Sequence, residues 1–156
     1  MAVDTKRVTG RRQLKFSCYD DILKDVHNLA CRPSRQLGNW SLGEICEHLS
    51  RAMNMAIDGS SIKAPWYIRV AAPLIKRRFL SRPMNPGFQL PRSAVQLMPN
   101  CKETQQGIAA LERAIERLKT EKERKPHFVF GHFTREEWDQ LQLRHSEMHL
   151  GFIVPE

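Results

Sequence analysis

The stretch that decides the fold is the last predicted helix, residues 134–151, TREEWDQLQLRHSEMHLG. Thr134 and Glu137 at its start have the spacing of a capping box, which is typical of a helix N-terminus. His145 and His149 lie four residues apart, so both imidazoles can point at one ion. Apolar residues recur on the same side of the helix at helical spacing: Trp138, Leu141, Met148 and Phe152. We therefore predict an amphipathic helix whose two histidines face inward.

Three further segments have the apolar spacing of amphipathic helices. The first follows Ser17 and ends at Pro33, the second begins with a capping box at Ser41 and runs to about Ile57, and the third spans about residues 104–123. No segment has a convincing alternating strand pattern. Four substantial helices without strands predict an all-α fold, with a helical bundle as its natural form.

A long connection separates the second helix from the third. Pro65 is suited to the first position of a short helix, and Pro73 is expected to kink or end it. The Trp, Tyr, aliphatic and basic residues of this stretch also suit a membrane-surface helix, but Pro73 interrupts its apolar face. We therefore expect a short helix packed beside the bundle. Residues 81–99 contain four prolines and form either a loop that covers a site or a plain crossover.

Length and composition favour one cytoplasmic domain over residues 1–156. An apolar fraction of 41% and a charged fraction of 27% are ordinary for a globular protein of 156 residues. The chain has no secretory segment and no apolar run long enough to span a bilayer. The cysteines are far apart and form no C-x-x-C pair: Cys18, Cys31, Cys46 and Cys101. We expect them to be reduced and mostly buried.

The net charge of +8 makes phosphate, acidic surfaces and anionic small molecules plausible partners. Many of the cations lie in two clusters, within residues 6–15 and residues 76–82. Neither cluster has the interleaved aromatic residues or the motif spacing of a nucleic-acid platform. A solvated surface is therefore the preferred interpretation of both clusters, and nucleic-acid binding is not favoured.

A third histidine, His48, lies on the flank of the apolar face of the second helix, between Ile45 and Ala52. Cys46 points about 160° away from His48 on the same helix and is a poor candidate for the same ion. Three neutral imidazoles between facing helices are typical of an open catalytic zinc site. They could instead be hydrogen-bonded core residues, but each unsatisfied nitrogen would cost about 1–3 kcal/mol.

The chain resembles the DinB/YfiT-like superfamily of metal-binding four-helix bundles. The resemblance rests on the segment NWSLGE of residues 39–44, on His48-Leu49, and on the late pair His145-x-x-x-His149. Within that superfamily, the segments KRVTGRR of residues 6–12 and FLSRPMNPGF of residues 79–88 resemble a bacterial subfamily whose function is uncharacterised. The resemblance covers most of the chain.

This resemblance implies an up-down-down-up bundle with a long crossover, accompanied here by a short extra helix and a proline-rich loop. It implies a zinc or nickel ion, and it assigns His48, His145 and His149 as the metal ligands. It further implies frequent homodimerisation. The reactions of the superfamily range from metal-dependent hydrolysis to transfer or isomerisation that depends on a low-molecular-weight thiol.

We therefore expect a hydrolase or thiol S-transferase in which the metal activates water or a low-molecular-weight thiol against a small electrophilic substrate. The positive charge of the ion favours an anionic or thiol substrate. Glu44, one turn before His48, could accept a proton or orient water, although its place in a capping box also explains it. The alternative is a non-catalytic metal-binding or stress-related bundle whose basic face binds an acidic partner or nucleic acid.

Overall fold

A computed structural model describes residues 2–62, 64–87, 92–101 and 103–156. Over these residues the chain is mostly helical, as the sequence predicted, with two short strands. The elements in chain order are α1 (Tyr19–Ala30), β1 (Ser34–Gln36), α2 (Leu42–Asp58), α3 (Trp66–Ser81), the 3-10 helix η1 (Arg92–Leu97), α4 (Thr104–Thr120), α5 (Arg135–Leu150) and β2 (Ile153–Pro155).

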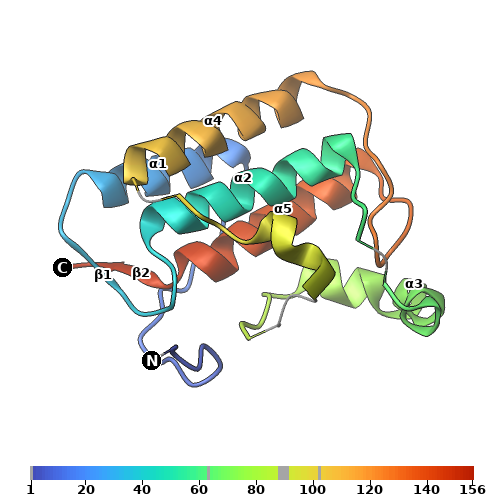
Figure 1. The fold of residues 1–156 in the computed structure, drawn as a ribbon, viewed down its shortest axis with the longest axis horizontal. Coiled ribbons are helices and arrows are strands. Elements are labelled where there is room, and N and C mark those ends of the chain that lie inside the picture. The colour runs from blue at the N-terminus through green and yellow to red at the C-terminus, as the bar shows by residue number, and fades with distance from the viewer. Residues whose placement is uncertain (1, 63, 88–91, 102) are drawn as a thin grey trace.

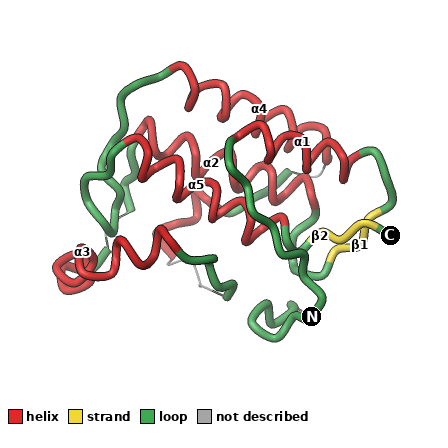
Figure 2. The backbone as a smooth tube through the Cα atoms, turned by 180° about the vertical axis from the view of Figure 1, so that it is seen from behind, coloured by secondary structure: helices red, strands yellow, loops and turns green. Residues whose placement is uncertain are grey.

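Helices α1, α2, α4 and α5 lie side by side and form the main body of the molecule (Figures 1 and 2). We call them the four core helices. Each contributes an apolar stripe at helical spacing, and burial of these stripes against one another is the main source of helix stability. The fully buried side chains of the shared core include Ile22, Val26, Ile45, Leu49, Leu111, Ile115, Trp138 and Leu150.

The capping boxes predicted at Ser41 and Thr134 are present. The backbone N–H of Glu44 donates to the Ser41 hydroxyl, and that of Glu137 donates to the Thr134 hydroxyl. Helix α1 begins later than Ser17, because the Asp21 carboxylate accepts hydrogen bonds from two backbone N–H groups just before the helix. Helix α4 ends at Thr120, since the polar run that follows has no apolar residue to bury.

Helices α2 and α4 approach closely at a pair of glycines. A Cβ atom on Gly107 would overlap the carbonyl group of Gly43, and a Cβ atom on Gly43 would lie 2.8 Å from the Cα atom of Thr104. Glycine permits such backbone contact because it has no side chain. The contact sets the position of the N-terminal half of α2, which carries Glu44 and His48.

Two short strands tie the C-terminal segment to the loop after α1. Strands β1 and β2 are antiparallel, with Ser34 opposite Pro155 and Gln36 opposite Ile153. Three residues are too few for an alternating pattern, so sequence periodicity did not reveal them. Arg12 adds to this anchor because its guanidinium donates to the backbone oxygens of Leu150 and Ile153. The end of α5 is thereby held in place.

Helix α3 packs beside the bundle as expected, because Leu80 belongs to the shared core and Lys76 pairs with Glu137 on α5, but it is longer than the short helix expected. It is 16 residues long, continues through Pro73, and buries only Ala72 and Leu80. Proline removes only one N–H donor, and the carbonyl of Arg69 that would have accepted its bond belongs to an exposed residue. Figures 1 and 2 show α3 at the edge of the four core helices, with a sharp bend along its length.

The centre of the proline-rich segment, residues 88–91, lies outside the described residues, and so does Phe88 of the quoted subfamily motif. Beyond it, η1 packs against α2 and buries Ala94 and Leu97 beside Ala52 and Ile62. This part of the segment is therefore an ordered neighbour of α2.

The cysteines are less buried than the sequence suggested. All four are free, but only Cys46 is buried, while Cys18 and Cys31 are exposed and Cys101 is intermediate. Cys18 and Cys31 lie at the two ends of α1, outside its apolar stripe. Their positions as caps, rather than core residues, explain the difference.

Within the described residues, no helix combines the length and the apolar character needed to cross a bilayer.

Candidate metal centre

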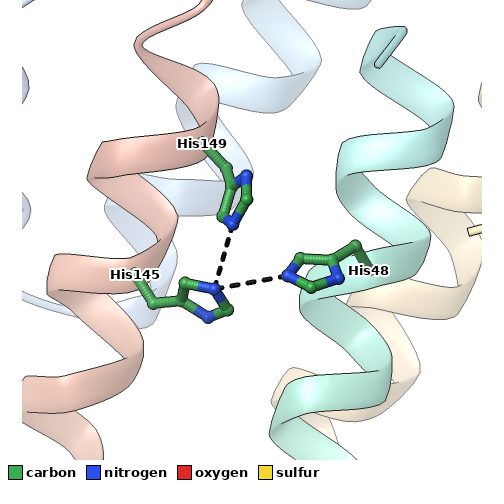
Figure 3. Close-up of side chains that lie close together, drawn as sticks. All are labelled: His48, His145 and His149. Atoms are coloured by element: carbon green, nitrogen blue, oxygen red, sulfur yellow. Dashed lines mark hydrogen bonds between the residues drawn. The ribbon is translucent and has the colours of Figure 1, made fainter. Parts of the chain in front are cut away.

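The structure brings His48 together with His145 and His149. His48 projects from the middle of α2, and the other two project from the last turns of α5 toward it (Figure 3). The Nε2 atom of His145 lies 3.3 Å from Nε2 of His48 and 3.0 Å from Nε2 of His149. One ring nitrogen of each residue lies within 4.8 Å of the other two, so the group could hold a metal ion.

Local sequence explains why these side chains converge. The four-residue spacing of His145 and His149 stacks the two rings on one side of α5. His48 follows the buried Ile45 by three residues, which turns it toward the core. His48 is only 2% exposed, whereas His145 and His149 are half-buried. The two residues on α5 are therefore less enclosed than His48.

A backbone carbonyl group fixes the orientation of His48. Its Nδ1 atom lies 2.7 Å from the Leu97 carbonyl oxygen. A carbonyl oxygen can only accept a hydrogen bond, so Nδ1 carries the proton and Nε2 keeps its lone pair. That lone pair points toward His145. Such a hydrogen bond on the nitrogen remote from the ion is the usual companion of a metal-binding histidine.

The three facing nitrogens fit a cation better than they fit one another. A neutral imidazole nitrogen is either a donor or an acceptor. If Nε2 of His145 donates to Nε2 of His48, it has no lone pair to offer His149; if it is an acceptor, it opposes the lone pair of His48. The arrangement therefore leaves hydrogen-bonding capacity unused in a largely buried place, which is costly. A divalent ion would accept all three lone pairs.

Burial also keeps the three imidazoles neutral, which metal ligation requires. Burial, with smaller contributions from His48 and His127, lowers the pKa of His145 to about 3. Burial and the two neighbouring imidazoles hold the pKa of His149 well below its ordinary value. Burial lowers the pKa of His48 as well, against the opposing effect of the Leu97 carbonyl.

Trp40 forms a wall of the cluster. Its ring stacks on His149, with centroids 5.3 Å apart and planes 19° apart, and it lies 4.7 Å from the ring of His48. Trp40 belongs to the segment NWSLGE, but its sequence context predicted no role for it. The contact of the Leu97 carbonyl with His48 was not predicted either. A backbone carbonyl has no side-chain signature, so only the packing of η1 on α2 reveals that contact.

Glu44 does not belong to the histidine cluster. One oxygen of its carboxylate accepts a hydrogen bond from the backbone N–H of Ser41 at 2.8 Å, as expected for a capping box. Cys46 also lies outside the cluster; burial raises the pKa of its thiol to about 12, which disfavours the thiolate that binds metals. His27, on α1, is not part of the cluster either. Its Nε2 atom lies 3.1 Å from the carboxylate of Glu112 on α4.

His127 is the remaining buried imidazole of interest and occupies a separate aromatic pocket. Its ring stacks against Phe128 and Phe133. Its Nδ1 atom accepts hydrogen bonds from the backbone N–H groups of Val129 and Phe130. His127 therefore has a structural role in this loop.

Among curated proteins and solved structures, no significant match to this chain is found. A family model described as "Protein of unknown function (DUF1569)" matches residues 8–156. The matched range contains all three clustered histidines, Trp40 and Leu97. Because the match covers almost the whole chain, this protein belongs to the DUF1569 family.

Proposed function

We propose that this protein is a metal-dependent enzyme that uses a zinc or nickel ion, held by His48, His145 and His149, to act on a small electrophilic substrate. The observation that carries the proposal is the convergence of three neutral imidazole nitrogens whose lone pairs cannot all be satisfied by one another. A structural site would more often be closed by a fourth protein ligand, commonly cysteine.

Three neutral ligands leave the charge of a divalent ion uncompensated. Bound there, the ion would supply Lewis-acid activation of water or of a low-molecular-weight thiol, and attraction for an anionic substrate. These two nucleophiles correspond to the two reaction classes proposed, hydrolysis and S-transfer.

The residues of the chain have separable roles in this proposal. The Leu97 carbonyl holds the His48 ring in one tautomer and orientation, so that Nε2 faces the other two ligands. The indole of Trp40 covers His48 and His149 and limits access of water on that side. Glu44 could receive a proton only by leaving its hydrogen bond to the Ser41 N–H, so we assign it no more than an auxiliary role.

We also propose that the four core helices are a DinB/YfiT-like bundle with up-down-down-up topology. Support comes from the long connection between α2 and α4 and from the positions of the three ligands on α2 and α5. Homodimerisation, which is frequent in that superfamily, would be tested by the molar mass of the chain in solution.

Elemental analysis of untagged protein tests the metal site. After reconstitution with zinc or nickel and removal of excess ion, we expect about one equivalent per chain. The His145→Ala variant should retain none, because only two ligands remain. A wild-type chain that holds less than about a fifth of an equivalent would contradict the proposal.

Catalysis is tested separately on the loaded protein. Activated esters and amides report hydrolysis, and electrophilic substrates with low-molecular-weight thiols report S-transfer. We expect turnover that follows metal content and disappears in His145→Ala. A loaded protein that binds one ion but turns over neither substrate class would support a binding protein in place of an enzyme.

A further inference from the structure

We propose that α3 is a peripheral membrane-binding helix that lays one face on an anionic lipid surface. The proposal is independent of the metal site. It begins from an apolar stripe that the fold leaves exposed. Trp66, Val70 and Leu74 follow one another at four-residue spacing, and they are 76%, 70% and 87% exposed. Contiguous exposed apolar surface of this kind marks an interaction site.

The exposed stripe faces solvent because the opposite side of α3 contacts the rest of the protein. The ammonium group of Lys76 lies 2.6 Å from the Glu137 carboxylate and 4.6 Å from the ring centroid of Phe133. Residues two apart on a helix point about 200° apart, so Leu74 faces the direction opposite to Lys76. Leu80 is buried as well. The core thus presents the stripe outward at a fixed angle.

Basic residues continue the stripe toward its C-terminal end. Arg77 and Arg78 are three and four residues after Leu74, so they lie on the same side of the helix and are exposed. Neither arginine has a salt-bridge partner in the described part of the chain, and α3 contains no acidic residue. Aromatic residues at one end and arginines at the other are characteristic of helices that lie in the lipid interface.

The positive charge of α3 favours an anionic lipid surface over a second copy of this chain as the binding partner of the stripe. A second copy of this face would offer no carboxylate to Arg77 and Arg78, whereas anionic headgroups would pair with both. The long arginine side chains can extend to the headgroups while Leu74 and Val70 enter the acyl boundary. Pro73 does not end α3, which runs from Trp66 to Ser81, although the helix bends along its length (Figures 1 and 2).

The test is sedimentation of the full-length chain with vesicles of phosphatidylcholine, with and without about one third phosphatidylglycerol. We expect binding only to the anionic vesicles, weakened by salt. Leu74→Asp should reduce binding by at least about tenfold, because it puts a charge into the apolar stripe. The double variant Arg77→Ala with Arg78→Ala should lose about fivefold for each arginine.

Two matched controls separate lipid contact from changes in charge or folding. Arg32→Ala with Arg113→Ala removes the same charge from exposed positions outside α3, and Gln105→Asp adds the same charge on α4. Both should bind vesicles almost as well as wild type. Equal binding to neutral and anionic vesicles, no binding to either, or equal losses in variants and controls would overturn the proposal. So would a dimer of the vesicle-free protein that Leu74→Asp dissociates.

Discussion

Buried imidazoles occur in two regions of this protein, and their surroundings differ in one respect. In the cluster of His48, His145 and His149, ring nitrogens face one another. In the aromatic pocket of His127, the Nδ1 lone pair accepts hydrogen bonds from two backbone N–H groups, 3.1 and 3.2 Å away. Burial lowers the pKa in both regions, to about 4 for His127 and about 3 for His145.

Burial and a lowered imidazole pKa are therefore not sufficient to identify a metal ligand, because both regions have them. What separates the two regions is the use of the lone pairs. The His127 Nδ1 lone pair is already satisfied by the loop that surrounds it, so no ion is needed there. The cluster on α2 and α5 brings three ring nitrogens within 4.8 Å of one another with lone pairs that no backbone N–H group satisfies, which suits a metal ion. Four experiments test this distinction.

The largest effect should come from matched histidine substitutions in the two regions. We expect His149→Gln to lower zinc affinity by more than about a thousandfold, because it removes one of only three ligands. His127→Gln should leave affinity unchanged. Isothermal titration with zinc measures both. As a charge control, the double variant Arg77→Ala with Arg78→Ala should bind zinc normally. Similar losses of zinc affinity in His149→Gln and His127→Gln would show that the cluster and the aromatic pocket do not differ in metal binding.

Zinc should also stabilise the folded chain through the cluster alone. At free zinc about a hundred times the dissociation constant, the free energy of unfolding should rise by about 2.7 kcal/mol. For a chain of this size the melting temperature should increase by roughly 5–10 °C. Thermal unfolding with and without zinc measures this shift. The shift should persist in His127→Gln and vanish in His149→Gln; its survival in the latter would contradict the ligand assignment.

The aromatic pocket should make metal-free protein sensitive to acid. Below pH 6.5 the unfolded chain protonates His127, whereas the folded chain resists protonation until its pKa of about 4. The unfolded state therefore binds more protons between these values, so stability falls as the pH drops through this window. For half-buried His127 the loss should be on the order of 2 kcal/mol.

Urea unfolding at pH 7 and pH 4.5 measures that loss, and His127→Gln isolates it from the contributions of the clustered histidines. The variant should show a smaller difference between the two pH values. An identical difference in wild type and His127→Gln would mean that His127 retains its ordinary pKa in the folded protein.

The smallest effect concerns the wall of the cluster. Trp40→Leu keeps an apolar side chain but removes the ring that stacks on His149. We expect zinc affinity to fall about tenfold, or about 1.4 kcal/mol, as is usual for groups that orient metal ligands. Zinc titration measures it, with Trp66→Leu on α3 as the matched control. A control that loses as much affinity as Trp40→Leu would refute the positioning role.

Much of the helical architecture was predictable from local sequence. Ser41 and Thr134 mark helix starts because the hydroxyl and the acidic residue three positions later satisfy free N–H groups at a helix N-terminus. The core stripes of α2 and α4 follow from apolar spacing. Pro73 was expected to kink or end its helix, and α3 bends but continues to Ser81. The strands β1 and β2 were missed because pairing three residues is a tertiary event.

The sequence by itself determined the chemical identity of the candidate site: three histidines, two of them on one face of one helix by their spacing. Only the tertiary structure decided that His48 meets the other two, because contact between α2 and α5 depends on the packing of the whole core. The Leu97 carbonyl that orients His48, and the exposure of the α3 stripe, were likewise decided by packing. Helical periodicity specifies which side chains share a face, but it does not specify what that face meets.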